Sequence, residues 1–386
     1  MVAVLDDITE DTLRADPFPV YARLRREAPV AWVRSVGAWL VTDWAGVRQV
    51  IESPETFASV DPFVSEYCGP VTILTLEGDA HAGIRASVDD RFTPETALAL
   101  DGVTAVTAAY ALAGLGTGEV DLIEAYFKPV SAVVLAHALG LDMVAPEELM
   151  RWSDGLTPSP EGPVRPEEDA RIRAAAAAID AALTPTVSRL TTTPDGSVLS
   201  RLIHGGRPPG RPRGADEVLA TLKMLMVSFR EPAMAAANTL HALLAHPGQL
   251  AAVRSDPALL DGAVREGLRW NPPVGTTDRM TSAPVRLGEY VLPAGERIVV
   301  VTASANRDES VFPDPETFDV RRPPAPLLTF GYGRHRCLVR ALVPRIVRMS
   351  LGVLLDGRPR IVPGSGGPAV MRGWRTRMPD RLVVEF

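Results

Sequence analysis

The chain has 386 residues, with 40 basic and 47 acidic side chains, so its formal net charge is −7 at neutral pH. Hydrophobic residues make up 46% of it, which is ordinary for a globular protein and excludes intrinsic disorder as the main state. The mild acidity excludes a general nucleic-acid binder, which would carry a strongly basic domain. The first residues are acidic and show no basic segment followed by an apolar one, so we expect no signal peptide.

Apolar runs in the chain are interrupted, for example by His137 and by Lys223. Because they fall short of the roughly 18 residues that a membrane span needs, we expect a cytoplasmic protein that binds no membrane. We also expect a monomer. The two cysteines, Cys68 and Cys337, lie far apart, which fits neither a disulfide scaffold nor a zinc site.

The first half of the chain predicts short helices around a strand pair. An amphipathic helix is expected over 20–27, after acid and proline residues that favour a helix start. The segment 30–41 alternates like two strands broken at Gly37, and Asp43 begins a new helix. Successive helices follow over 80–204, and the segment 205–214, rich in glycine, proline and arginine, is expected to be a mobile loop.

The second half predicts a long helix over 215–245, a helix over 259–270 stopped by Pro272, and two strands within 285–303 around a turn at Gly295. The proline-rich segment 306–329 is too long for an ordinary connection, so we expect it to be functional or held by something other than its own core. No repeat or shift in composition divides the chain. We therefore expect one mainly α-helical domain over residues 1–386.

The segment 330–337 reads Phe-Gly-Tyr-Gly-Arg-His-Arg-Cys. Its glycines allow a tight loop whose backbone can approach a flat ligand closely. A helical pattern starts at Leu338, and a helix N-terminus favours the thiolate form of Cys337, which is a metal ligand. On composition alone, a structural cysteine buried in a glycine-rich turn is the simpler interpretation.

This segment resembles the haem-binding loop of the cytochrome P450 family, Phe-x-x-Gly-x-His/Arg-x-Cys. Glu266 and Arg269 match the Glu-x-x-Arg of the family's K helix, where residues three apart can pair. Residues 312–319 match the stretch before the haem loop, and Arg322, or alternatively Arg321, is expected to join that pair and brace 306–329. The resemblance implies a single P450-type domain, a helical bundle with a small β region, with haem between the long distal helix and the cysteine loop.

The resemblance makes Cys337 the axial ligand of the iron of haem b, because the chain has no Cys-x-x-Cys-His for covalent attachment. The two haem propionates need cations or hydrogen-bond donors. By the family's pattern, the haem-binding residues are His81, Arg85, Arg279, Phe330, His335 and Cys337. Without the family, His81 and Arg85 would be read as a solvated helix face.

On the distal side, family members usually carry Ala-Gly-x-(Asp/Glu)-Thr, whose acid and hydroxyl support proton delivery to O₂. Residues 228–233 read Ser-Phe-Arg-Glu-Pro-Ala instead. Pro232 has no hydroxyl and cannot donate to the carbonyl of Ser228, so we expect the helix to kink or widen and that carbonyl to be free for water or substrate. The candidate catalytic residues are Ser228, Arg230, Glu231 and Pro232. Either Glu231, water or substrate replaces the missing alcohol, or the proline is a tolerated drift.

Two further departures follow the cysteine. Val339 stands where the family favours glycine, and Pro344 falls inside the expected helix. They put in doubt the exact seat of the haem and the hydrogen bonding of the thiolate, more than haem binding itself.

The activity implied is that of a bacterial monooxygenase, which inserts one oxygen atom of O₂ into a small organic substrate, with a natural-product intermediate as the expected class. The chain has no dinucleotide motif, so electrons from NAD(P)H must come through separate redox proteins. Arg334, Arg336 and Arg340 would attract an acidic ferredoxin. The alternatives are an oxidant with a non-standard distal site, for phenol coupling, aryl-ether demethylation or peroxide use, and a haem protein without monooxygenase activity.

The resemblance also indicates which segments contact the substrate. They are the loop 59–75, the region 157–166, the distal helix, Val274 with Gly275, and the chain near Met371.

Overall fold

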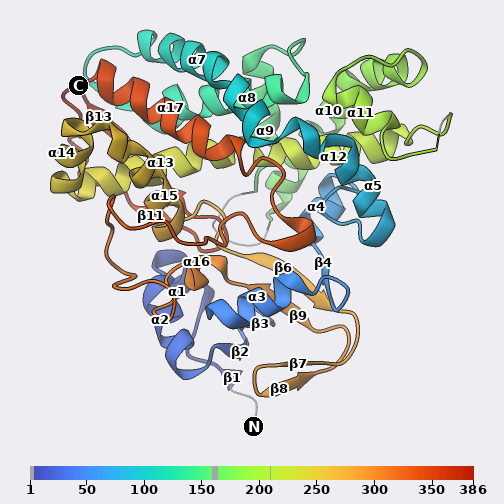
Figure 1. Cartoon of the computed structure of the whole chain (residues 1–386), viewed down its shortest axis with the longest axis horizontal. Helices are drawn as coiled ribbons and strands as arrows, with labels where there is room; N and C mark the ends of the chain where they lie inside the picture. The colour runs from blue at the N-terminus through green and yellow to red at the C-terminus, as the bar shows by residue number, and fades with distance from the viewer. Residues whose placement is uncertain (1–3, 159–163, 209) are drawn as a thin grey trace.

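The computed structural model describes residues 4–158, 164–208 and 210–386. Figure 1 shows a large helical part above a smaller lobe that holds most of the strands, with the N-terminus at the tip of that lobe and the C-terminus in the helical part. The expected mainly α-helical fold with a small β region is confirmed.

The main sheet of the strand-rich lobe combines strands from residues 4–59 with strands from residues 277–300. Its strands, in the order β1-β2-β3-β9-β6-β4, are Val4–Leu5, Val30–Val33, Ala38–Val41, Arg297–Val300, Thr277–Thr281 and Phe57–Ser59. The expected hairpin is β2 with β3, turning at Gly37, whose φ of 64° favours glycine. β3 pairs in parallel with β9, so Trp39 lies opposite Ile298. Helices α1 (Glu10–Ala15), α2 (Phe18–Glu27), α3 (Trp44–Glu52) and α16 (Thr302–Ala305) complete the lobe.

The expectation of two strands within 285–303 is wrong, because three are present. β7 (Val285–Leu287) and β8 (Tyr290–Leu292) form a hairpin, and β9 then returns to the main sheet. Two glycines make this possible. Gly288 has a φ of 58° between β7 and β8, and Gly295 has a φ of 86° before β9, so the chain reverses twice where the sequence indicated one turn.

The helical part encloses one continuous core. Val130, Ile179, Leu222, Leu240 and Leu351, from five helices, are all fully buried in it. Its helices are α4 (Pro62–Tyr67), α5 (Gly78–Val88), α6 (Pro94–Ala99), α7 (Asp101–Ala113), α8 (Lys128–Leu139), α9 (Pro146–Leu156), α10 (Pro166–Thr192), α11 (Val198–His204), α12 (Ala215–Val227), α13 (Glu231–Ala245), α14 (Pro247–Ser255), α15 (Leu260–Trp270) and α17 (Leu342–Gly357). Small sheets form from β5 (Glu119–Asp121), β10 (Val362–Pro363) and β13 (Val383–Glu385), and from β11 (Met371–Arg372) and β12 (Met378–Pro379).

One apolar stretch escaped the sequence analysis. Among the described residues, Pro94–Ala113 is the helical stretch whose length and composition would suffice to cross a membrane. The structure divides it into α6 and α7. α7 packs against α17, where Asp101 pairs with Arg345, while its outer face exposes Val106 and Tyr110.

The segment 205–214 forms neither helix nor strand in its described part, but its two ends are packed where we expected mobility. A Cβ atom on Gly206 would lie 2.0 Å from the carbonyl oxygen of Gly83 in α5, so the two backbones touch. Arg213 is buried and donates to the carbonyls of Leu202 (2.6 Å) and Gly205 (2.8 Å). The loop therefore packs on α5, the helix that carries His81 and Arg85.

The segment 306–329 has no helix or strand and is held by a buried ion pair, as expected. Arg269 donates to both carboxylate oxygens of Glu266 at 2.8 Å, and it also bonds the carbonyls of Asn306, Pro315 and Thr317. Arg322, and not Arg321, is the third member, with its Nε 3.1 Å from Glu266. This network, the brace, supplies the hydrogen bonds that the segment cannot make with itself.

Candidate functional site

The long helix expected over 215–245 is interrupted where the sequence places the candidate catalytic residues. α12 ends at Val227, a 3₁₀ turn covers Ser228–Arg230, and α13 begins at Glu231. Because Pro232 has no N–H, the α-helical bond to Ser228 cannot form, and the amide of Glu231 donates to the Ser228 carbonyl instead. The expected break is present, but the helix tightens where we allowed for widening, and the Ser228 carbonyl is not free.

The next carbonyl in the break is also occupied. The hydroxyl of Ser131 in α8 donates to the carbonyl of Phe229, and this hydrogen bond is buried. Phe229 stands where the family's motif has glycine, and its bulky side chain is buried. Its backbone carbonyl is hydrogen-bonded to the neighbouring helix α8. The break is a fixed feature of the core.

Glu231 is half-buried at the end of this break, where α13 begins. Burial raises the pKa of its carboxyl to about 7, although Arg230 and the Ser228 hydroxyl both favour the ionised form. Burial also lowers the pKa of Arg230, which is attracted to Glu231 and to Asp154 of α9. A carboxyl with a pKa near neutrality holds a proton that it can also release.

The cysteine loop has the conformation that its glycines predicted. Gly331 and Gly333 have φ values of 65° and 67°, and a 3₁₀ turn covers Gly333–His335. The amide of Cys337 donates to the carbonyl of Phe330 at 2.8 Å, which closes the loop, and the amide of Val339 donates to the sulfur. Burial raises the pKa of the Cys337 thiol to about 12, and the negative charge of Glu231 acts in the same direction.

The helix after the loop begins later than expected. α17 starts at Leu342 and not at Leu338, and Val339 lies in the connecting turn. Pro344 is the third residue of α17, in the first turn, where backbone N–H groups have no helical partner and a proline removes nothing. Pro344 therefore does not interrupt α17.

Three of the expected propionate ligands meet in space. His81 comes from α5, Arg279 from β6 and His335 from the cysteine loop, and all three side chains are buried. The two imidazole rings lie 4.2 Å apart, and the Nδ1 atom of each is buried without a hydrogen-bond partner. Arg85, the fourth, forms an ion pair with Asp89 at 2.9 Å and acts electrostatically on both His81 and Cys337.

Glu77 belongs to the same cluster and was missed from the sequence. Its carboxylate lies 3.0 Å from Nε2 of His335, and its other oxygen accepts from the amide of Ser59 at 2.8 Å. The residue precedes α5 without any motif of its own, so only the folded structure shows that it faces the cationic cluster.

The cluster fits a group with anionic arms. Burial and the nearby His335 and Arg85 lower the pKa of His81 to about 4, which is the effect expected where donors and cations gather with few anions. The orphaned imidazole nitrogens and the buried guanidinium of Arg279 would all gain partners from two carboxylates. Two residues after His335, the half-buried Cys337 carries a sulfur that is a soft ligand suited to iron.

The comparisons with known proteins agree with this geometry. Residues 252–351 match the family model described as "Cytochrome P450". The chain is 33% identical to cytochrome P450 monooxygenase PikC of Streptomyces venezuelae, over 89% of this chain and 84% of that protein. It is 30% identical to 6-deoxyerythronolide B hydroxylase of Saccharopolyspora erythraea, over 92% of this chain and 95% of that protein.

A solved structure shows the same fold. The ligand-free structure of cytochrome P450 TbtJ1 superposes with a TM-score of 0.85 at 28% identity and covers 96% of this chain and 97% of that one. The family's cofactor is haem with a cysteine thiolate on the iron, and its activity is that of a monooxygenase. With the cysteine loop, the brace and the buried cationic cluster all in the order that this family requires, the chain belongs to the cytochrome P450 family.

Proposed function

We propose that this monooxygenase, one domain over residues 1–386, binds haem b between the distal break (Ser228–Ala233) and the cysteine loop (330–337), with Cys337 as the axial ligand. The observation that carries the proposal is the buried cluster of His81, Arg279 and His335 next to the cysteine loop, because its unpartnered imidazole nitrogens and buried guanidinium suit the two propionates of a haem. When bound, the haem iron supplies the activation of O₂. The protein's part is to hold that group, exclude water and deliver protons.

The propionates would be held by His81, Arg85, Arg279 and His335. Unpaired imidazole nitrogens on His81 and His335 support this assignment, as does the burial of Arg279, because a buried guanidinium needs an anion more than an exposed one does. Arg85 would contribute mainly charge, since Asp89 already occupies one edge of its guanidinium. Phe330 would position the loop through its carbonyl.

Proton delivery would fall to Glu231. The usual threonine hydroxyl is absent, the Ser228 carbonyl is occupied, and the Ser228 hydroxyl is hydrogen-bonded to the Glu231 carboxyl. Arg230 would tune this acid by its charge, and Pro232 would fix the direction of the side chain by starting α13 there. The alternative, an oxidant that works without this relay, differs in that replacing Glu231 would leave turnover unchanged.

Electrons would reach the haem from NAD(P)H through a separate ferredoxin-type protein. Arg334 and Arg336 are exposed on the cysteine loop, and Arg340 is half-buried and donates to the Cys337 carbonyl at 3.3 Å. An acidic partner docking there would lie against the loop that holds the sulfur. Charge reversal at Arg336 should slow ferredoxin-supported turnover more at low salt than at high salt.

We propose a mid-sized, partly polar natural product as the substrate class. Relatives of this chain include hydroxylases named for 6-deoxyerythronolide B and for vitamin D₃. Of the expected contact segments, Val274 forms a bridge to Thr376 and Gly275 packs against the backbone of Trp374, so these segments lie together. Met371 lies instead beside Asn271, and residues 159–163 of the region 157–166 are outside the described residues.

We also propose a monomeric, cytoplasmic protein. A location away from a membrane is supported by the apolar stretch Pro94–Ala113, because its helix α7 packs on α17 and its Asp101 pairs with Arg345 of α17.

The test is a screen of natural products for displacement of water from the haem iron, read as a shift of the Soret band. Hits are then assayed for oxygenated product with NADPH and a surrogate ferredoxin system. A hit that is turned over supports the proposal. A holoprotein that binds such compounds but consumes NADPH without ever releasing an oxygenated product would contradict it.

A further inference from the structure

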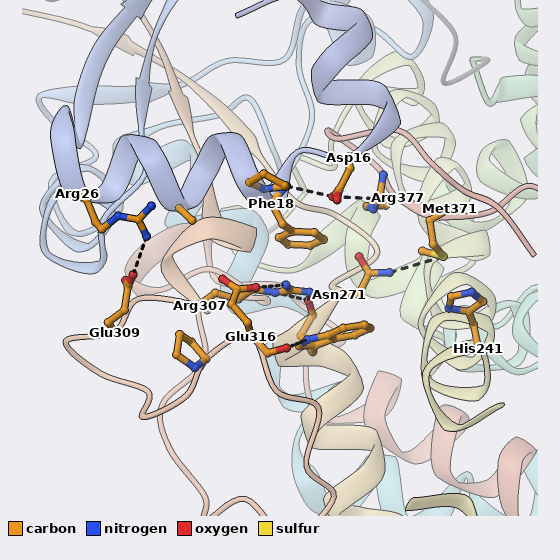
Figure 2. A pocket seen from close by; sticks show the side chains of 14 residues that line it. Asp16, Phe18, Arg26, His241, Asn271, Arg307, Glu309, Glu316, Met371 and Arg377 are labelled. Atoms are coloured by element: carbon orange, nitrogen blue, oxygen red, sulfur yellow. Dashed lines mark hydrogen bonds and ion pairs between the residues drawn. The ribbon is translucent and has the colours of Figure 1, made fainter. Parts of the chain in front are cut away.

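A second cavity lies outside the haem site, where the strand-rich lobe meets the helical part (Figure 2). Its volume is about 670 Å³, which is within the range of sites for drug-sized ligands. The start of α2, the end of α15, the segment 306–329 and β11 all contribute to its wall, and none of the residues assigned to the haem does. It is therefore a separate candidate site.

One side of this cavity is a rigid stack of flat groups. The guanidinium of Arg307 lies 3.5 Å from the ring centre of Phe18 and 4.6 Å from that of Trp270. Arg307 is buried and fixed by the Trp270 carbonyl and by the Glu316 carboxylate, while the Trp270 indole donates to the Glu316 carbonyl at 2.9 Å. Planar surfaces held in this way favour a planar, aromatic ligand.

The charges in the wall are already matched in pairs. Arg307 pairs with Glu316, Arg26 lies 3.7 Å from Glu309, and Arg377 lies 3.9 Å from Asp16. A charged ligand would have to break one of these pairs or bring its own counter-ion. The wall therefore favours a neutral molecule.

The wall also contains an amide whose hydrogen bonds are unmet. The side chain of Asn271 is buried, its oxygen has no hydrogen-bond partner, and its nitrogen meets the Met371 sulfur at 4.0 Å, which is a weak contact. The Asn271 carbonyl accepts from Asn238 at 2.9 Å, so the backbone is fixed. A buried amide in this state is unfavourable by itself, and a second amide, with a donor and an acceptor side by side, satisfies both of its ends once the flexible Met371 moves aside.

We propose that this cavity is a second small-molecule site, and that its ligand is a neutral, planar aromatic compound carrying a primary amide. The aromatic body lies against Phe18 and Trp270, and the amide pairs with Asn271. Asn271 is three residues before Val274, so this ligand and the distal substrate would bind to neighbouring parts of the same backbone.

The test uses the holoenzyme with excess imidazole on the iron, so that any binding at the haem appears as a change in the Soret band. Indole-3-carboxamide is titrated by calorimetry, with 3-methylindole as the matched compound without an amide. We expect one site for the carboxamide, at least tenfold weaker binding of 3-methylindole, and an unchanged Soret band.

Two variants address the site in different ways. Ala22→Trp fills the cavity without removing any polar contact, and Asn271→Leu removes the amide at similar size; each should weaken the carboxamide at least tenfold. Ala109→Trp, on the exposed face of α7, is the matched control and should bind as the wild type does. The carbon monoxide spectrum of each variant verifies its fold. Absence of binding at millimolar carboxamide, equal affinity in Ala22→Trp and Ala109→Trp, or displacement of imidazole would overturn the proposal.

Discussion

The brace around Glu266 and the distal break around Glu231 each contain a glutamate on a helix, but its carboxylate has many partners in the brace and few in the break. Glu266 accepts hydrogen bonds from Arg269, Arg322 and the amide of Asp319, so its carboxylate has many partners. Glu231 is next to a single arginine and one hydroxyl, and burial raises its pKa to about 7. A carboxylate with many partners fixes the fold, whereas one with few can exchange a proton.

The largest effect should come from the brace. Arg269→Ala leaves Glu266 buried with fewer partners and frees the backbone carbonyls of Asn306 and Pro315, so the free energy of unfolding should fall by about 3–5 kcal/mol. The measurement is thermal unfolding together with haem content after purification. Arg321→Ala, an exposed neighbour of the brace, is the control and should leave both unchanged. If Arg269→Ala unfolds at the wild-type temperature, the brace does not hold the segment.

Cys337 has two roles that a substitution can separate: its backbone closes the loop, and its sulfur would bind the haem iron. Its closure depends on the backbone bond from Cys337 to Phe330, so Cys337→Ser should keep the fold while losing the strongly red-shifted Soret band of the reduced carbon monoxide complex. Circular dichroism and that spectrum are the two measurements. A wild-type spectrum in Cys337→Ser would show that another group is the ligand.

The distal acid should affect chemistry without affecting the fold. Glu231→Gln keeps the size of the side chain and removes its proton, so product formation should fall roughly 10- to 100-fold while the haem spectrum stays unchanged.

The raised pKa of Glu231 predicts how product formation depends on pH. Because burial raises the pKa of Glu231 to about 7, its carboxyl is mainly protonated at pH 6 and mainly ionised at pH 8. Product formed per NADPH consumed should therefore decline across this range in the wild type and stay flat in Glu231→Gln. Parallel profiles for the two proteins would mean that another group delivers the proton.

The sequence predicted these two regions to different extents. The family resemblance predicted the brace, because Glu266 and Arg269 match the Glu-x-x-Arg motif on one helix, and it left Arg321 as an alternative to Arg322. The break at Pro232 was also readable, since proline cannot make the bond to Ser228. Whether the helix widens or tightens at the break could not be predicted, because this depends on the hydrogen bond between the Phe229 carbonyl and Ser131. These two residues are almost one hundred positions apart in the sequence.

Other features could not be predicted from the sequence, because they too depend on contacts between distant segments. Glu77 has no local pattern, and its place beside His335 depends on how α5 packs on the cysteine loop. The cavity beside Asn271 is formed by residues from five separate segments of the chain, so no single stretch of sequence indicates it. The late start of α17 depends on the sulfur and on Val339, whose amide donates to Cys337 while its carbonyl accepts from Leu342 and Val343.

The smallest effect is expected at Pro232, and it tests whether the break itself is needed. Pro232→Thr restores the family's hydroxyl and adds an N–H that competes with the Glu231 amide for the Ser228 carbonyl. Because Pro232 lies in the first turn of α13, where its N–H is not required, the fold should tolerate the change. The new bond would draw residues 228–232 toward α-helical geometry and narrow the space beside the iron. Substrate binding, measured by the Soret shift, should weaken a fewfold, and coupling of NADPH consumption to product formation should not rise. Higher coupling with unchanged binding would mean that the proline is a tolerated drift and that Glu231 needs no break to act.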